Sequence, residues 1–242
     1  MMKGVILAGG MGTRLRPLTE VTNKHLLPVY SHPMIDYPLM TLKKAGITEI
    51  LLITGGEHIG AFMNYLGSGK KFGVNLTYKI QDEAGGIAQA IFLARDFVGS
   101  EKFVVILGDN ILEENIDVFV SNFEKGSADA IFFFKEVPDP QRYGVPIFED
   151  GRLVDVEEKP KQPKSQYAST GLYIFDHNCF EYIDTLEPSA RGELEIPDVH
   201  NQYIQKNKLK WELLHGFWTD AGKFETLFLA NSYWAKKKSN QI

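Results

Sequence analysis

Short runs of apolar residues recur along the first half of the chain and alternate little with polar residues. The runs are Lys3–Ala8 (KGVILA), Glu49–Thr54 (EILLIT) and Phe103–Leu107 (FVVIL). Each has the length of a β-strand and is rich in Val, Ile and Leu. Strands that are apolar on both faces are typical of parallel sheets covered by helices on both sides. The pattern therefore predicts three buried, parallel strands.

Segments with a helical spacing of apolar residues lie between these runs. Met34–Ala45 carries Leu39 and Leu42 on one face, and Gly46 follows as a C-cap. Residues 83–99 form a second segment with a broad apolar face. The order β-α-β-α-β over the first 110 residues predicts a doubly wound α/β sheet with right-handed crossovers.

The second half of the chain is more mixed. We expect strands at Ala130–Val137, Leu153–Glu157, Gly171–Asp176 and Leu209–Leu214. Asn178–Leu186 and Gly222–Lys238 are expected to be helices, and the lysines that close the second one suit a helix C-terminus. No internal repeat and no clear domain boundary is visible, so we expect one continuous domain over residues 1–242.

Composition and charge narrow the class of protein. The 242 residues are 44% apolar and 24% charged, which excludes a disordered, collagenous or coiled-coil chain. The net charge of −5 gives no basic field for nucleic acid. Cys179 is the single cysteine and cannot form an intrachain disulfide. No signal peptide and no apolar stretch of about 18 residues is present, so we expect a cytoplasmic protein without membrane contact.

The strongest local signal is the segment LAGGMGTRLRPLT, which directly follows the first apolar run. Gly9, Gly10 and Gly12 allow a sharp turn and close backbone approach to a ligand. Backbone amides in such a loop, followed by a helix start, form an anion site, and Arg14 suits phosphate oxygens. A tight structural turn with solvated arginines is the alternative. Leu15 occupies the third glycine position of a dinucleotide fingerprint, which disfavours an NAD-dependent dehydrogenase, and no complete Walker A motif is present.

Seven colinear segments together resemble the sugar nucleotidyltransferase family. The first of the seven is the glycine segment together with KHLLPV (Lys24–Val29), which is similar to that family's signature. The other segments resemble its glucose-1-phosphate thymidylyltransferase branch, in a short form without a C-terminal helical extension. They are QDEAGGIAQA, LGDNI, RYGV, VEEKP, YASTGLY with RGELEI, and WTDAG.

The resemblance implies a Rossmann-like, mixed, mostly parallel sheet with helices on both faces in a single nucleotidyltransferase domain. Its nucleotide-binding part covers about residues 1–110 and its sugar-binding part about 111–242. The implied enzyme uses Mg²⁺ to transfer a thymidylyl group from dTTP to glucose 1-phosphate. The products are pyrophosphate and dTDP-glucose, which leads towards dTDP-rhamnose and other deoxysugars. A homo-oligomer is expected. The alternatives are a uridylyltransferase, a thymidylyltransferase for another sugar 1-phosphate, and a non-catalytic nucleotide-sugar sensor.

Site residues are assigned by their positions in the matching motifs. The catalytic residues are Arg14, Lys24 and Lys159, and the metal ligands are Asp109 and Asp220. The nucleotide is expected to contact Ala8, Gly9, Gly10, Gly12, Thr13, Arg14, Lys24, Gln81 and Gly86. The sugar phosphate is expected to contact Gly144, Glu158, Lys159, Thr170 and Gly171.

Several of these residues have ordinary structural alternatives. Asp109 ends an apolar strand, where a carboxylate can hold Mg²⁺ or cap a helix. Lys159 would by itself be a surface lysine, and an extended strand would point it and Glu158 to opposite faces. His25 replaces the glutamine that is commoner in the family; it either touches the nucleotide or fills space, and we expect the latter. Glu193 is expected near the sugar or at a helix start.

Overall fold

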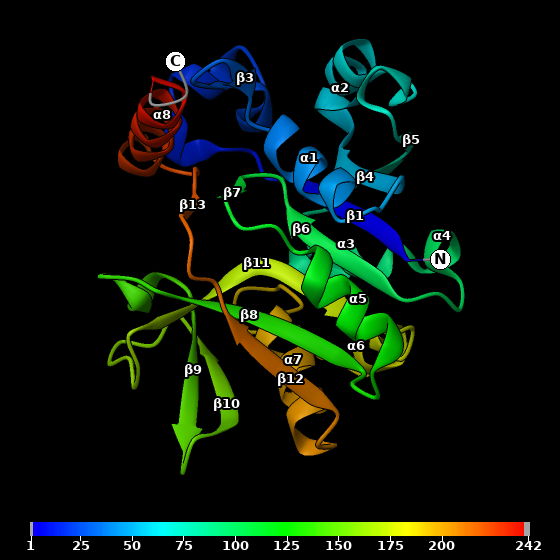
Figure 1. Cartoon of the computed structure of the whole chain (residues 1–242), viewed down its shortest axis with the longest axis vertical. Coiled ribbons are helices and arrows are strands. Elements are labelled where there is room, and N and C mark those ends of the chain that lie inside the picture. The colour runs from blue at the N-terminus through cyan, green and yellow to red at the C-terminus, as the bar shows by residue number, and fades with distance from the viewer. Residues whose placement is uncertain (1, 240–242) are drawn as a thin grey trace.

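The three apolar runs form adjacent strands at the centre of one sheet (Figure 1). The computed structural model describes residues 2–239. Its strands β1 (Lys3–Ala8), β4 (Glu49–Gly55) and β6 (Phe103–Leu107) begin where the sequence predicts. β1 pairs in parallel with β4 on one side and β6 on the other, as the unbroken apolar pattern predicts.

The sheet has seven strands in the order β12-β8-β11-β6-β1-β4-β5. The outer members are β5 (Asn75–Gln81), β8 (Ala130–Glu136), β11 (Tyr167–Phe175) and β12 (Leu209–Leu213). β11 runs antiparallel to both β6 and β8, and the other pairs are parallel. The predicted mixed, mostly parallel sheet is confirmed.

Alternate side chains of the central strands enter two separate cores. Ile6 and Ile106 face one core, whereas Val5 and Val105 face the other. Helices α1 (Asp36–Lys44), α2 (Ile59–Leu66) and α5 (Asp117–Lys125) cover the first face. The second face is covered by α3 (Gly86–Phe92), α4 (Arg95–Val98), α6 (Cys179–Asp184) and α7 (Ile196–Gln205). Helices therefore cover both faces, as predicted.

Smaller elements surround this sheet. Three two-stranded pairs are β2 (Pro28–Val29) with β3 (His32–Pro33), β7 (Asn110–Leu112) with β13 (Trp218–Asp220), and β9 (Gly144–Glu149) with β10 (Arg152–Glu158). The 3₁₀ turns are η1 (Thr13–Leu15), η2 (Leu18–Glu20), η3 (Lys24–Leu26), η4 (Gly56–His58), η5 (Lys70–Phe72) and η6 (Pro140–Arg142).

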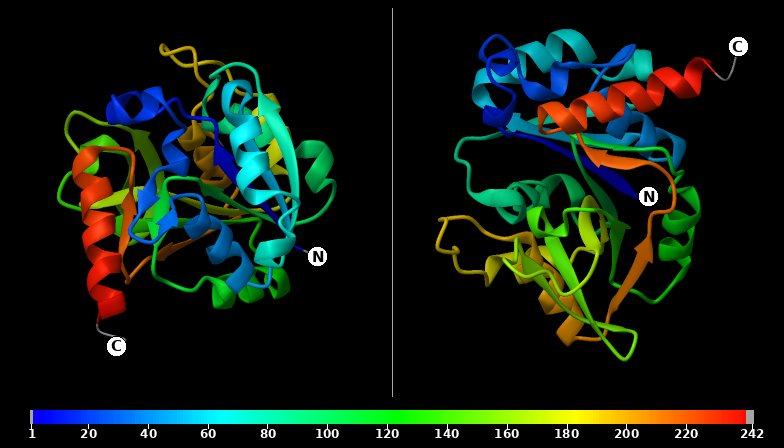
Figure 2. Two further views of the ribbon diagram at one scale, coloured as in Figure 1. Left: turned by 90° about the horizontal axis from the view of Figure 1, so that it is seen from above. Right: turned by 90° about the vertical axis from the view of Figure 1, so that its left-hand side faces the viewer.

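The last helix, α8 (Phe224–Ser239), lies beside the N-terminal segments although it is distant in sequence (Figure 2). Leu227 and Ala230 of α8 join a third core with Val29 and Met34. The predicted helix Gly222–Lys238 is confirmed with its start shifted by two residues. Residues 240–242, which end the predicted short form, lie outside the described part of the chain.

Two of the expectations about secondary structure are corrected. The single helix expected over residues 83–99 is wrong, because the structure has α3 and α4 there instead. Gly86 has φ +95°, which keeps the preceding residues out of the helix. The order β-α-β-α-β is incomplete, because the edge strand β5 lies between α2 and α3. Polar and apolar residues alternate along β5 and none of them is fully buried, so it lacks the unbroken apolar run of a central strand.

The strand order produces a switch point between β1 and β6. From β1 the chain builds the sheet to one side through β4 and β5, and β6 then returns to the other side of β1. Open α/β sheets bind ligands at the carboxyl ends of strands at such a point. The glycine loop follows β1 there, and Asp109 follows β6. In residues 2–239, no helix combines the length and the apolar character needed to span a bilayer.

A histidine lies fully buried between helix and sheet. His200 of α7 is inaccessible to solvent, and its ring centroid is 3.8 Å from that of Phe132. Neither ring nitrogen has a hydrogen-bond partner among the described residues. Burial lowers the pKa of His200 from 6.5 to about 3. The folded protein therefore holds this imidazole neutral over a range in which the unfolded chain protonates it.

We predict that His200 makes the protein less stable as the pH falls from 6.5 towards 3. In this range the unfolded state binds a proton that the folded state does not, so the free energy of unfolding falls by about 1.4 kcal/mol per pH unit. His200→Leu should reduce this slope by up to that amount in urea unfolding between pH 4 and 6. His215→Gln, at an exposed position, is the control and should leave the slope unchanged. An unaltered slope in His200→Leu would contradict the prediction.

Candidate functional site

Two adjoining cavities of about 270 Å³ each open beside the carboxyl ends of β1 and β6. The glycine-loop cavity is lined by Leu7, Gly9, Gly10, Lys24, His25, Gln81, Ala84, Gly86, Ile87, Ala90, Leu107, Asp109 and Glu193. The hairpin cavity lies towards β9 and β10, and its polar lining includes Arg14, Asp109, Asn110, Arg142, Tyr143, Glu158, Lys159, Ser169 and Asp220. Ile87, Leu107 and Asp109 line both cavities, so a ligand extending from one to the other would pass Asp109.

The glycine loop is packed against Lys24. Gly12 has φ +65°, and a Cβ there would lie 2.9 Å from Lys24 Cβ. A Cβ at Gly9 would lie 2.6 Å from Gln81 Oε1. Side chains at these positions would collide with the residues expected to bind nucleotide. The expected helix start is only the three-residue turn η1, so a helix dipole contributes little, and an anion here would be held by backbone amides and nearby cations.

Lys24 and Asp109 form a buried ion pair at the junction of the two cavities. Lys24 Nζ lies 2.5 Å from Asp109 Oδ2, and the two side chains are only 11% and 10% exposed. Burial alone would raise the pKa of Asp109, but the Lys24 ammonium outweighs it and holds the pKa well below its usual range. Asp109 is therefore ionised at neutral pH. It lies between β6 and β7 and does not cap a helix.

Asp220 reaches the same cavity from the other end of the chain. It lies opposite Asn110 in the β7–β13 pair, and the following Ala221 N–H donates to the Asp109 carbonyl over 2.8 Å. Tyr143 donates its hydroxyl proton to Asp220 Oδ1 over 2.8 Å. Burial, and then the negative charge of Asp109, raises the pKa of Asp220. The structure thus brings the two predicted carboxylates to one cavity.

This pair of carboxylates has the donor chemistry of a magnesium site. Mg²⁺ prefers oxygen ligands and is commonly held by one or two carboxylates together with substrate phosphates. Burial and then the Asp109 charge raise the pKa of Asp220, and a dication would neutralise the second contribution. Within residues 2–239, no group of three or more His, Cys, Asp or Glu side chains is arranged to hold a metal. Asp109 and Asp220 would therefore share such an ion with ligand oxygens.

Lys159 and Glu158 face each other across the end of β10. β10 ends at Glu158, and Lys159 has φ +46°, so the extended geometry stops between them. Lys159 Nζ lies 2.7 Å from Glu158 Oε1. Arg191 lies 3.5 Å from the same oxygen. The two side chains were expected on opposite faces only if the strand continued through Lys159; it does not, and both line the hairpin cavity.

Arg14 extends from the glycine loop into the hairpin cavity. A Cβ at Gly222 would lie 3.0 Å from Arg14 Nη2 and 3.3 Å from Asp109 Oδ2. The small residue at 222 therefore lets the guanidinium and the carboxylate approach the same point.

Four predicted residues do not line either cavity. Ala8 lies buried at the end of β1, where its carbonyl accepts a hydrogen bond from Thr54 Oγ1 at 3.2 Å. Gly12 shapes the loop, and Thr13 is exposed. Thr170 donates its hydroxyl to the carbonyl of Phe133 over 2.9 Å. The Thr170 side chain therefore stabilises the pairing of β11 with β8.

The far wall of the glycine-loop cavity is formed by Gln81, Gly86 and Glu193. Gln81 Nε2 donates to Gln89 Oε1 over 2.6 Å, which fixes the amide near the cavity. A Cβ at Gly86 would lie 2.5 Å from the Leu194 carbonyl oxygen, so packing alone requires a glycine there. Glu193 was expected near the sugar or at a helix start. The structure places it on the glycine-loop cavity, and α7 begins later, at Ile196.

His25 forms part of the wall beside Lys24. Its Nδ1 lies 2.7 Å from Asn23 Oδ1, which also accepts the His25 backbone N–H over 2.9 Å. Because that oxygen can only accept, Nδ1 carries the proton. Burial, and then the Lys24 charge, lowers the pKa of His25 to about 3. The ring is neutral and fills the space beside Gly108, where a Cβ would lie 2.7 Å from His25 Cδ2.

Sequence reasoning did not single out several residues of the hairpin cavity. Arg142 donates to Asp139 over 2.6 Å and lies 3.6 Å from Asp220. Tyr143 bonds Asp220, and Trp218 donates its indole N–H to Asn110 Oδ1 over 2.7 Å. Arg142, Tyr143 and Trp218 lie inside the quoted RYGV and WTDAG segments, so the motifs contained the signal. Their partners became visible only once the strands were paired.

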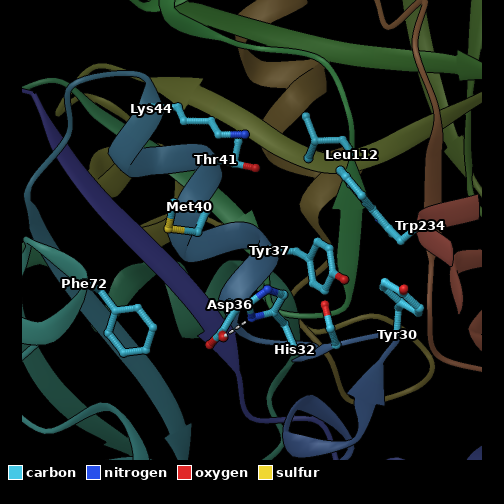
Figure 3. Close-up of a pocket in the computed structure, with 11 residues that line it drawn as sticks. Tyr30, His32, Asp36, Tyr37, Met40, Thr41, Lys44, Phe72, Leu112 and Trp234 are labelled. Carbon is cyan, nitrogen blue, oxygen red and sulfur yellow. Dashed lines mark ion pairs between the residues drawn. The ribbon is translucent and has the colours of Figure 1, made fainter. Parts of the chain in front are cut away.

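A third cavity of about 290 Å³ lies between α1, α8 and the β2–β3 pair, and sequence reasoning missed it (Figure 3). It shares no lining residue with the other two cavities. His32 Nδ1 lies 3.5 Å from Asp36 Oδ2, and Tyr65 donates to that same oxygen over 2.8 Å. Burial raises the pKa of Asp36. The side chains of Tyr37 and Trp234 also line the cavity, with Tyr37 between Asp36 and Trp234 in the view of Figure 3.

This chain is similar to known proteins over nearly its whole length. A family model described as nucleotidyl transferase matches residues 3–237. The chain is 44% identical to a glucose-1-phosphate thymidylyltransferase of Neisseria meningitidis, over 96% of this chain and 82% of the relative.

Two solved structures are also similar to this chain. A Bacillus anthracis protein, described as a glucose-1-phosphate thymidylyltransferase and solved with a sucrose, is 50% identical with a TM-score of 0.93. The alignment covers 96% of this chain and 95% of that one. A UDP-glucose pyrophosphorylase complexed with UDP-glucose is 25% identical with a TM-score of 0.85, covering 98% of this chain and 100% of that one.

Proposed function

Because the chain belongs to the nucleotidyl transferase family, we propose that it transfers a thymidylyl group from dTTP to glucose 1-phosphate. The products are dTDP-glucose and pyrophosphate. The observation that carries the proposal is the junction of two cavities at Asp109, with Lys24 on one side and Lys159 and Asp220 on the other. Two phosphorylated substrates that must react with each other need adjacent sites with shared charge at their boundary. The names of the relatives supply the identity of the two substrates.

The nucleotide occupies the glycine-loop cavity in this proposal. The base lies against Gln81 and Gly86, and the triphosphate lies over Gly9 and Gly10 near Lys24. The sugar lies in the hairpin cavity against Gly144, Glu158 and Gly171, with its phosphate beside Lys159. This arrangement supports a nucleotide-binding part of about residues 1–110 and a sugar-binding part of about 111–242. Arg14 and Glu193 each cross that division.

The chain's own residues align the reactants and balance their charge. The sugar phosphate is already an anion, so its oxygen attacks the α-phosphorus in line without a general base. Lys159 orients that phosphate, and Arg14 and Lys24 stabilise the charge that develops on the pyrophosphate as it leaves. Asp109 keeps the Lys24 ammonium at the boundary between the cavities. Asp109 and Asp220 would hold Mg²⁺, which supplies neutralisation of the phosphate charges when it is bound.

A uridylyltransferase is the second candidate. The structural likeness to a UDP-glucose pyrophosphorylase favours it, although the identity of 25% is half that of the Bacillus anthracis structure. Thymine and uracil present the same hydrogen-bonding edge to Gln81, so this side chain does not separate them. A non-catalytic sensor is disfavoured, because Arg14, Lys24, Asp109, Lys159 and Asp220 are all present.

Three further properties belong to the same proposal. The product feeds dTDP-rhamnose and other deoxysugar synthesis, and the enzyme acts in the cytoplasm as a homo-oligomer. A cytoplasmic location is supported by Cys179, which is a buried free thiol.

The substrate assignment predicts a defined ranking of nucleotides. With Mg²⁺ and glucose 1-phosphate, pyrophosphate release should be fastest with dTTP, measurable with UTP and negligible with ATP or GTP. One methyl group in a pocket is worth roughly 1–3 kcal/mol, so rejection of UTP should be mild, whereas purines mismatch in size. The same assay with other sugar 1-phosphates tests the sugar. A preference for a purine would overturn the base site.

Asp109→Asn is predicted to abolish turnover while the protein remains folded. The change is nearly isosteric, but it removes the charge that holds Lys24 and would hold Mg²⁺. Pyrophosphate release and circular dichroism should be measured together. Asp150→Asn, at the exposed turn of the β9–β10 hairpin, is the control and should retain normal activity. Wild-type turnover of Asp109→Asn at saturating Mg²⁺ would remove Asp109 from the site.

Lys159→Ala should lower kcat/KM for the sugar phosphate at least tenfold. Charge-assisted hydrogen bonds contribute about 1.5–3 kcal/mol, and this one both binds and aligns the attacking phosphate. Steady-state kinetics with each substrate varied in turn should show a higher KM for glucose 1-phosphate. Lys161→Ala changes an exposed lysine of the same loop and should have little effect. If only the KM for dTTP changed, Lys159 would belong to the nucleotide side.

A further inference from the structure

Asn110 is a buried amide whose side chain joins three elements of the site. It is 2% exposed and lies at the start of β7. Its Oδ1 accepts the Gly171 backbone N–H over 3.0 Å and the Trp218 indole N–H over 2.7 Å. Its Nδ2 donates to Asp109 Oδ1 over 3.2 Å. One side chain thus connects β11, β13 and the carboxylate that follows β6.

The chemistry of the partners fixes the orientation of this amide. The Gly171 and Trp218 nitrogens can only donate, so they must face the amide oxygen. Asp109 is an ionised carboxylate and can only accept, so it must face the amide nitrogen. Rotating the amide by 180° would break all three hydrogen bonds. Asn110 is therefore held in a single orientation.

The same residue lies between the two carboxylates of the site. In the β7–β13 pair, Asn110 is directly opposite Asp220. Trp218 is two residues before Asp220 on β13, and Asp109 immediately precedes Asn110. The Trp218 bond therefore anchors the strand that carries Asp220, and the Asp109 bond sets the rotation of the other carboxylate. Gly171 on β11 is also closely packed against Asn110, because a Cβ at Gly171 would lie 2.6 Å from Asn110 Nδ2.

We propose that Asn110 is a positioning residue that fixes the spacing of Asp109 and Asp220 and thereby sets the affinity of the site for a divalent cation. The inference rests on the proposed function for the role of these carboxylates. Asn110 acts through Asp109 and through β13 and takes no part in bond making. Gly171 lies on the wall of the hairpin cavity, so the same amide also connects that wall to the metal carboxylates.

Binding of Mn²⁺ to the protein–dTTP complex, without sugar phosphate, tests this independently of turnover. Titration calorimetry or Mn²⁺ electron paramagnetic resonance should give a dissociation constant at least tenfold higher for Asn110→Ala than for the unchanged protein. Asn231→Ala is the matched control. That amide accepts the Tyr30 N–H over 2.7 Å and donates to the Leu227 carbonyl over 2.8 Å, and it lines neither cavity of the site. It should leave Mn²⁺ affinity unchanged.

A second variant separates positioning from structural support. Asn110→Asp keeps the oxygen that accepts from Gly171 and Trp218 but places a negative oxygen against Asp109. Its kcat should fall at least tenfold in protein that circular dichroism shows to be folded. In a background with Trp211→Phe and Trp234→Phe, the emission of Trp218 should shift in Asn110→Ala and stay unchanged in Asn110→Asp.

The outcomes discriminate between the two proposals. Wild-type Mn²⁺ affinity in a folded Asn110→Ala, or wild-type kcat in Asn110→Asp, would overturn the positioning role. Absence of Mn²⁺ binding in the unchanged protein would overturn it as well, together with the metal site. Intact Mn²⁺ binding that weakens in Asn110→Ala, in a protein that does not turn over dTTP, would support the role of Asn110 and contradict the proposed function.

Discussion

The buried pair of Lys24 and Asp109 is the interaction on which the rest of the site depends. Lys24 supports the glycine loop, because Gly10 and Gly12 pack against its aliphatic part. The Asp109 carboxylate pairs with the Lys24 ammonium and accepts a hydrogen bond from the Asn110 side chain. The Asp109 backbone carbonyl accepts a hydrogen bond from the Ala221 N–H. Removing one partner of a buried ion pair typically costs about 3–5 kcal/mol, because the other charge stays buried. The shape of both cavities therefore follows from one contact between the loops after β1 and β6.

Charge balance explains how such a site is stable without its substrates. Two of the cations expected to meet a phosphate already have an acidic partner: Lys24 has Asp109, and Lys159 has Glu158. Arg142, which lines the same site, lies 3.6 Å from Asp220. Burying a charge without a partner would cost far more than these pairs contribute. Phosphate oxygens would enter in competition with carboxylates, and a dication would relieve the crowding of Asp109 and Asp220. Burial and then the charge of Asp109 raise the pKa of Asp220, whereas the Lys24 ammonium outweighs burial and lowers the pKa of Asp109.

The sequence predicted the centre of the fold better than its edge. β1 and β6 agree with the expected Lys3–Ala8 and Phe103–Leu107 residue for residue, since a buried parallel strand needs an unbroken apolar run. β5 was missed because an edge strand is apolar on one side only. The helix expected over residues 83–99 starts only at Gly86, whose φ of +95° keeps the preceding residues out of the helix, and helical periodicity does not encode this. It is also divided into α3 and α4. The spacing of apolar residues therefore predicts those helices and strands that are buried in the same way along their whole length.

The sequence predicted only those site residues that lie in motifs resembling the family's. Asp109 and Asp220 were named by resemblance, but their meeting results from the β7–β13 pair, which joins distant parts of the chain. Thr170 lies in a matching motif, yet its hydroxyl is bound to Phe133 and faces away from both cavities. Asn110 lies in the LGDNI segment, but the sequence assigns it no role, because a lone Asn after an Asp has no periodic signature. Its importance comes from two donors that lie 61 and 108 residues away. Motifs identify the segments that form the site, whereas the hydrogen bonds made in the fold identify which of their residues hold the others in place.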